Sequence, residues 1–137
     1  TLGDELLMPT RIYARDCLAL IDAVEVHAMS HVTGGGLASN LARVIPDSCQ
    51  VQIDRATWRP AAIFRLIERL GEISQSALEA TFNMGVGMVA IVSPDSVDEA
   101  ITLLAGRGLH CWICGSVVPA RSGGGGTVSL LGDYAAG

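Results

Sequence analysis

Three consecutive glycines, Gly34, Gly35 and Gly36, connect a predicted strand to a predicted helix within the segment 31–40, HVTGGGLASN. Glycine permits positive φ and lets the backbone approach a ligand closely, because it has no Cβ. The first N–H groups of a helix lack intrahelical partners and carry partial positive charge. The spacing therefore predicts a cradle for an anion such as phosphate. A tight turn whose glycines serve only packing explains the same residues, and both interpretations stand at this point.

His31 directly precedes this glycine run. We interpret it as a hydrogen-bond donor to a bound ligand or as a residue that orients the glycine run. His27 lies four residues earlier, so the two side chains share a face of a strand or helix. That pattern would suit a metal, but no third ligand lies nearby in the sequence, so we expect no metal site. We expect His110 to be structural.

A second pair of glycines, Gly85 and Gly87, lies in the segment 81–88, TFNMGVGM. The pair separates the end of a predicted helix from an apolar predicted strand. One glycine that ends the helix and a second that starts the strand would explain this spacing. The alternative is a second ligand-binding loop, in which the side-chain amide of Asn83 binds or orients the ligand.

The elements that must position these residues follow from hydrophobic periodicity and from glycine and proline signals. Thr10 is the expected N-cap of the first helix, and Gly71 is the expected C-cap of the third. Because strands alternate with helices, the order predicts an α/β (α+β) fold, a layered α/β/α sandwich with a mixed, mostly antiparallel sheet. Helices are predicted over residues 11–23, 37–44, 60–70, 76–82 and 95–104, and strands over 25–33, 49–53, 87–92, 110–118 and 127–131.

Two further segments are predicted to be loops. Residues 1–11 contain Pro9 and show no helical stripe. Residues 120–127 contain four consecutive glycines and are predicted to be a flexible glycine-rich connection in a hairpin between the last two strands. This run has no lysine and precedes no helix, so it lacks the features of a phosphate-binding loop.

The composition restricts the possible classes of function. The chain has 137 residues, of which 50% are hydrophobic and 17% charged, and this predicts a single domain, residues 1–137, with a sizeable core. Its net charge of −5 argues against nucleic acid and anionic membranes as partners. No apolar run approaches the roughly 18 residues that span a bilayer, and we expect no signal segment. All nine basic residues are arginine, which excludes chemistry that depends on a lysine of this chain.

The four cysteines are expected to be structural. Cys111 and Cys114 form a C-x-x-C pattern inside a predicted strand, where odd spacing sends the two sulfurs to opposite faces. No second pair completes a zinc site. A chain with this much core needs no disulfide framework, so we expect a reducing, cytoplasmic setting.

Three motifs in order carry a family resemblance. They are residues 6–13 (LLMPTRIY), residues 31–37 (HVTGGGL) followed by Asn40 and Arg43, and residues 82–88 (FNMGVGM). With these motifs the chain resembles the C-terminal domain of aminoimidazole ribonucleotide synthetase, also called phosphoribosylformylglycinamidine cyclo-ligase. The resemblance covers nearly the whole chain and is far more specific than a lone glycine triplet.

The sequence departs from the family pattern at two positions. Ser39 and Ala77 stand where the family commonly has acidic residues. Both lie beside the motifs rather than inside them, and we interpret them as tolerated variation.

The resemblance implies a fold with some likeness to the ferredoxin-like arrangement and a role in purine biosynthesis. The family uses ATP, magnesium and commonly potassium to close the imidazole ring of aminoimidazole ribonucleotide. Its ATP and magnesium sites lie mainly on an N-terminal domain of the same polypeptide, and the full-length enzyme is expected to be a homodimer that binds small-molecule nucleotides. This chain is then expected to be a C-terminal fragment that is inactive alone. A non-catalytic ligand- or partner-binding module and an oligomerisation fragment are the alternatives.

The resemblance also implies which residues form the site. Arg11 and Arg43 are candidates for phosphate contact, although surface or structural ion pairing explains each of them as well. The residues expected to bind substrate or phosphate are His31, Thr33, Gly34, Gly35, Gly36, Asn40, Asn83, Gly85 and Gly87.

Overall fold

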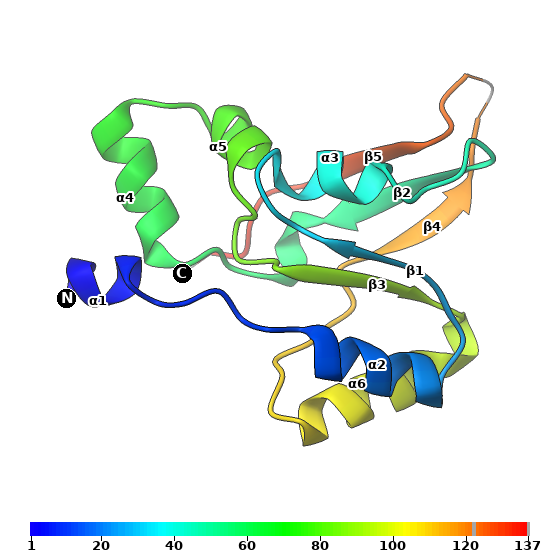
Figure 1. Ribbon diagram of the computed structural model, residues 1–137. Coiled ribbons are helices and arrows are strands. Elements are labelled where there is room, and N and C mark those ends of the chain that lie inside the picture. Colours follow the sequence, from blue (N-terminus) through cyan, green and yellow to red (C-terminus); the bar gives the residue numbers. More distant parts are fainter. Residues whose placement is uncertain (122, 137) are drawn as a thin grey trace.

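The computed structural model describes residues 1–121 and 123–136 (Figure 1). Its helices are α1 (Leu2–Leu6), α2 (Ala14–Ala23), α3 (Gly36–Ala42), α4 (Ala62–Gly71), α5 (Gln75–Thr81) and α6 (Val97–Gly106), with short 3-10 turns η1 (Arg55–Thr57) and η2 (Pro94–Ser96). Its strands are β1 (Val26–His31), β2 (Cys49–Asp54), β3 (Met88–Val92), β4 (Gly115–Pro119) and β5 (Thr127–Leu131). Within the described residues, every helix is too short or too polar to span a bilayer.

The strands form two small sheets, and helices pack around them. β1 pairs antiparallel with β3 in a two-stranded sheet. In the second sheet β2 is central, antiparallel to β4 and parallel to β5. The predicted α/β class with mixed and antiparallel pairing is confirmed, and its strands are divided between two sheets.

The β1–β3 sheet separates two apolar clusters. Val89 and Ile91 pack into a cluster with α3 and the second sheet, whereas Ala90 and Val92 pack against α2 and α6. This alternation follows from the two-residue period of a strand, which sends successive side chains to opposite faces. Helices α2 and α6 therefore cover one face, and the β4–β2–β5 sheet lies on the other (Figure 1).

Several helix boundaries differ from the sequence prediction. Residues 1–11 contain α1, whose capping box joins Thr1 and Asp4. Helix α2 begins at Ala14 after Tyr13, so Thr10 does not cap it. Helix α4 includes Gly71 as its last residue, and Glu72 takes the left-handed conformation with φ 52° instead.

The strand predicted over 110–118 is wrong in its first half. Strand β4 starts at Gly115, which pairs with Ile53 near the end of β2. The chain leaves the sheet at Arg55, where η1 begins, so the residues before Cys114 have no strand to pair with. The C-x-x-C pattern therefore lies outside the sheet, and Cys111 donates from its Sγ to the carbonyl oxygen of Ile101 over 3.6 Å.

The expected hairpin between the last two strands is also wrong, because β4 and β5 flank β2 instead of pairing with each other. The connection crosses the start of β2, where the N–H of Gly126 donates to the carbonyl oxygen of Cys49 over 2.9 Å. A Cβ at Gly125 would overlap the backbone of Asp47. These glycines therefore permit a close backbone crossing. Ser122 of this connection lies outside the described residues.

Candidate functional site

The fold brings the two glycine motifs together at one end of the β1–β3 sheet. His31, the last residue of β1, pairs with Met88, the first residue of β3. The N–H of Val32 then donates to the carbonyl oxygen of Gly87 over 2.9 Å. Because the strands are antiparallel, the chain after β1 and the chain before β3 leave the sheet side by side. We call residues 33–36 the first glycine turn and residues 83–87 the second glycine turn.

The first glycine turn is a tight turn that leads into α3. The N–H of Gly36 donates to the carbonyl oxygen of Thr33 over 3.2 Å. Gly35 has φ 97° and ψ −4°, which is the geometry that the third position of a type II turn requires and that favours glycine. Among the described residues, the N–H groups of Gly34 and Gly35 make no hydrogen bond to the protein. These two groups are open to an incoming acceptor.

Asn40 holds the first glycine turn from inside. Its side chain is buried, with the residue only 4% exposed. Its Nδ2 donates to the carbonyl oxygens of Thr33, Gly34 and Gly36 over 3.3, 3.2 and 2.8 Å. Its Oδ1 accepts from the hydroxyl of Thr33 over 3.4 Å. The Asn40 amide thus directs its hydrogen bonds into the turn, and it fixes the backbone that would face a ligand.

The three glycines have different surroundings. A Cβ on Gly36 would overlap the carbonyl oxygen of Glu79 in α5, so this glycine permits close packing of α3 on α5. A Cβ on Gly34 would meet nothing within 4 Å. At Gly35 it would lie 3.5 Å from the Ser39 hydroxyl, an ordinary contact. The packing interpretation therefore holds for Gly36, whereas Gly34 and Gly35 leave space beside the backbone.

The second glycine turn has positive φ at two successive residues, Met84 (50°) and Gly85 (94°), the pattern of a type I′ turn. Asn83 accepts the N–H of Gly85 on its Oδ1 over 3.0 Å and the N–H of Val86 on its carbonyl oxygen over 2.9 Å. The indole Nε1 of Trp58 donates to the carbonyl oxygen of Met84 over 3.1 Å. Positive φ at a non-glycine residue is uncommon and clusters at functional sites. The positive φ of the buried Met84 is therefore a further reason to regard this turn as part of the candidate site.

Tyr13 is a site neighbour that motif reasoning missed. A Cβ at Gly87 would overlap the Tyr13 hydroxyl, so Gly87 makes room for this ring. The ring also meets His31 edge-to-face, with centroids 5.6 Å apart. Tyr13 belongs to the first family motif, and that membership was the only signal in the sequence for its presence here.

The remaining sequence candidates lie elsewhere. His27 is near the far end of β1, where its Nε2 lies 2.9 Å from the Ser93 hydroxyl. Arg43 caps the C-terminal end of α3, opposite to the glycine turn, and its side chain is exposed, as is that of Arg11. Burial raises the pKa of the Cys114 thiol, which lowers its reactivity as a thiolate.

An ion pair involves Glu79 of α5, the helix that precedes the second glycine turn. The guanidinium of Arg55 binds the Glu79 carboxylate with two parallel bonds, 2.7 and 2.8 Å long. Burial pushes the pKa of Glu79 upward, but hydrogen bonds from Arg55 and Gln75 outweigh it, so the net pKa is lowered. The same hydrogen bond raises the pKa of Arg55. Burial is the largest cause that raises the pKa of the Tyr134 hydroxyl, and the nearby Glu79 raises it further.

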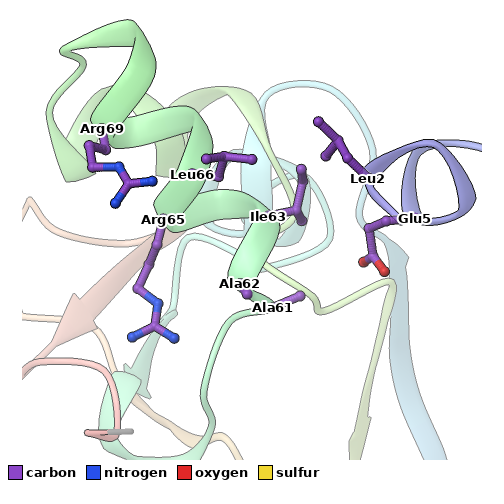
Figure 2. Close-up of a pocket in the computed structure, with 8 residues that line it drawn as sticks. All are labelled: Leu2, Glu5, Ala61, Ala62, Ile63, Arg65, Leu66 and Arg69. Atoms are coloured by element: carbon purple, nitrogen blue, oxygen red, sulfur yellow. The ribbon is translucent and has the colours of Figure 1, made fainter.

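Two hollows lie away from both glycine turns. The larger, about 710 Å³, is a groove between α1 and α4, with Leu2 and Glu5 on one side and Ile63, Leu66 and Arg69 on the other (Figure 2). The other, about 670 Å³, lies beside the connection between β4 and β5. Neither hollow is lined by a residue of the two glycine turns.

Known proteins match this chain over most of its length. Residues 1–127 match the family described as "AIR synthase related protein, C-terminal domain". A protein of Streptomyces fradiae named "Putative phosphoribosylformylglycinamidine cyclo-ligase" is 55% identical over 98% of the chain and 75% of its own length. Phosphoribosylformylglycinamidine cyclo-ligases of Nitrosococcus oceani and Anaeromyxobacter sp. are 44% and 48% identical over 90% and 85% of the chain.

The chain spans only part of these relatives. It covers 35% and 34% of the Nitrosococcus and Anaeromyxobacter proteins. The match to the AIR synthase related family extends from residue 1 to residue 127. It therefore includes all three sequence motifs, both glycine turns and α5. The chain belongs to the family of AIR synthase related C-terminal domains.

Proposed function

We propose that this chain forms one wall of the active site of an ATP-dependent cyclo-ligase, which converts formylglycinamidine ribonucleotide to aminoimidazole ribonucleotide in purine biosynthesis. The names of its relatives support the activity. The observation that carries the proposal is the meeting of two motifs from distant parts of the sequence at one end of the β1–β3 sheet, where the N–H of Val32 bonds the carbonyl oxygen of Gly87. Both turns contain glycines, which let the backbone approach a phosphate group closely.

The reaction needs positioning more than it needs a reactive side chain. ATP transfers its terminal phosphoryl group to the formyl amide oxygen of the substrate. A nitrogen of the amidine side then attacks the activated carbon, and inorganic phosphate leaves with that oxygen, giving the imidazole ring, ADP and phosphate. In phosphoryl transfer the protein mainly aligns the groups and neutralises their charge, so a chain without lysine can form one wall of such a site.

The geometry divides the expected site residues into two groups. A Cβ would meet nothing within 4 Å at Gly34 and Gly85 and only ordinary contacts at Gly35. We assign these three glycines to ligand contact together with the exposed side chains of His31 and Thr33. Asn83 shares its turn with Gly85 and sets that turn through its own hydrogen bond.

The second group shapes the turns. Asn40, Gly36 and Gly87 are engaged by the protein itself, and we assign to them the support of the turns.

We propose that magnesium, potassium and most ATP contacts belong to an N-terminal domain of the same polypeptide. Among the described residues, no group of three or more His, Cys, Asp or Glu side chains could hold a metal ion. Ser39 and Ala77 supply no carboxylate beside the turns. The site residues of this chain therefore suit substrate positioning, with the metal supplied from the other wall of a cleft. We further propose a homodimeric, cytoplasmic enzyme.

A chimeric enzyme tests the proposal. The chain replaces the matching third of the Nitrosococcus oceani cyclo-ligase, and aminoimidazole ribonucleotide is assayed with ATP, magnesium and formylglycinamidine ribonucleotide. We expect product from the chimera and none above background from the isolated chain. Product from the isolated chain would overturn the division between two domains. A folded chimera that binds both substrates without turnover would favour a non-catalytic binding module.

A glycine substitution then tests the phosphate contact. Gly35→Ala in the chimera adds a Cβ that makes only ordinary contacts but strains its φ of 97°, at a cost of about 1 kcal/mol. A misplacement of about 1 Å in a positioning site costs roughly 10²-fold in rate, so we expect kcat/KM to fall far more than stability. Gly108→Ala is the matched control, because Gly108 has φ 76° and open space but lies after α6. Equal kinetics in the two folded variants would leave the first turn as ordinary architecture.

A further inference from the structure

Both glycine turns depend on α5, the helix that lies against α3 (Figure 1). The second glycine turn follows α5 after Phe82, the C-cap of that helix. The first glycine turn meets α5 at Gly36, which lies so close to the carbonyl oxygen of Glu79 that a Cβ would overlap it. A displacement of α5 would therefore change the position of one turn relative to the other.

The Arg55–Glu79 ion pair ties α5 to the second sheet. Its side chains are only 16% and 9% exposed, in that order. The paired N–H···O bonds fix both distance and orientation, because a planar guanidinium and a carboxylate match in only a narrow range of angles. The remaining Nη1 of Arg55 donates to the carbonyl oxygens of Leu130 and Gly132 over 2.7 and 3.0 Å. One guanidinium thus joins the end of β2, helix α5 and the end of β5.

We propose that Arg55 and Glu79 are positioning residues, which set the spacing of the two glycine turns through α5 and thereby the affinity of the site for phosphate groups. This inference rests on the proposed function, which places phosphate-bearing substrates at the turns. The two side chains act through the helix backbone, since their polar atoms bond to each other, to Gln75 and to β5.

A second ion pair of the same chemistry provides a matched control. The Nε of Arg107 binds the Asp16 carboxylate over 2.7 Å and ties the end of α6 to α2. These helices cover the other face of the β1–β3 sheet. If this pair serves stability alone, its loss should change the free energy of unfolding and leave the turns in place.

The experiment compares Glu79→Gln with Asp16→Asn in the 137-residue chain. Inorganic phosphate is titrated while the amide signals of Gly34, Gly35 and Gly85 are followed by NMR, and residual dipolar couplings of these N–H groups are measured without phosphate. A denaturant midpoint is recorded for each variant. Arg55→Lys keeps the charge but loses the paired geometry, and it serves as the second variant if Glu79→Gln fails to fold.

We expect Glu79→Gln to reorient the three amides and thereby to weaken phosphate binding roughly tenfold, the effect of about one weakened hydrogen bond from a turn to the phosphate. Asp16→Asn should change the dissociation constant less than about twofold, with a small midpoint shift. Unchanged affinity and unchanged couplings in folded Glu79→Gln would overturn the proposal.

A wild-type chain that does not respond to phosphate would count against the cradle in the proposed function. The dipolar couplings would then decide the positioning role alone. Reorientation in Glu79→Gln and not in Asp16→Asn would support it, and equal couplings would refute it.

Discussion

The glycine-turn end of the β1–β3 sheet and the flank formed by α1 and α4 differ in where their side chains find partners. At the glycine turns, Leu37, Asn40 and Met84 are all buried. On the flank, no residue of α1 or α4 is buried, although apolar side chains recur along α4 at helical spacing. Leu70, the last of them, is 73% exposed.

The glycine turns are held in place by buried contacts within the chain. The apolar side chains of α1 and α4 are at least partly exposed and contribute less to the stability of the fold. At the turns, backbone contacts and a buried amide leave few alternative conformations. On the flank, the ring of Phe64 in α4 meets that of Phe82, the C-cap residue of α5, with centroids 5.9 Å apart. Substitutions of comparable chemistry should therefore have large effects at the turns and small effects on α4.

The largest effect is expected at Gly36. Gly36→Ala would place a Cβ on the carbonyl oxygen of Glu79 at a φ of 75°, which forces α3 and α5 apart. We expect a loss of about 3 kcal/mol or more in the free energy of unfolding, as for overpacking combined with backbone strain, measured by denaturant titration. Gly34→Ala, with open space, should stay within about 1 kcal/mol of wild type. Equal losses at the two glycines would break the distinction between packing and open positions.

Asn40→Ala comes next. It removes three hydrogen bonds to backbone carbonyls of the first glycine turn. Unpaired buried polar groups cost about 1–3 kcal/mol, and we expect about 2 kcal/mol with faster amide hydrogen exchange across residues 33–37. The neighbouring exposed Ser39→Ala should cost less than about 0.5 kcal/mol. A turn that keeps its exchange protection in Asn40→Ala would show that the amide is dispensable.

The pH dependence of stability sharpens the comparison further. The pKa of Glu79 is lowered in the folded chain, so its contribution is complete above the unfolded-state value of about 4.3. It is lost as the pH falls below that value through the lowered folded pKa. We expect the free energy of unfolding to fall between pH 5 and acid in wild type, and this loss should be smaller in Glu79→Gln, which has no carboxylate at this position. Parallel stability curves for the two proteins over that range would contradict it.

The smallest effect is expected on α4. Leu70→Gln replaces an apolar side chain that is already 73% exposed, so the free energy of unfolding should change by less than about 0.5 kcal/mol. Leu78→Ala in α5, where the residue is 1% exposed, should cost about 2–5 kcal/mol. A large loss in Leu70→Gln would show that the flank packs more tightly than its exposure indicates.

Local pattern predicted the elements well and their association poorly. The apolar run before Ser93 and the glycines before it placed β3 within one residue, because a buried strand bounded by glycine is a local signal. The division of five strands between two sheets could not be predicted, since it depends on pairings such as Ile53 with Gly115.

The candidate site shows the same limit. The glycine turns were found from their residue types, but the contrast between Gly34 and Gly36 depends on the carbonyl oxygen of Glu79, far away in the sequence. The contact of Tyr13 with Gly87 and the pairing of Arg55 with Glu79 likewise arise only when distant elements pack.

The central place of β2 has a consequence for the order in which the chain folds. β2 is synthesised well before both strands that pair with it, β4 and β5, because α4, α5, β3 and α6 lie between them in the sequence. Its two edges stay unpaired while β1 and β3 can already join. Because closing such long loops is slow, completion of the β4–β2–β5 sheet should be the late step of folding. Nascent chains that stop before Thr127 should then expose β2 to aggregation.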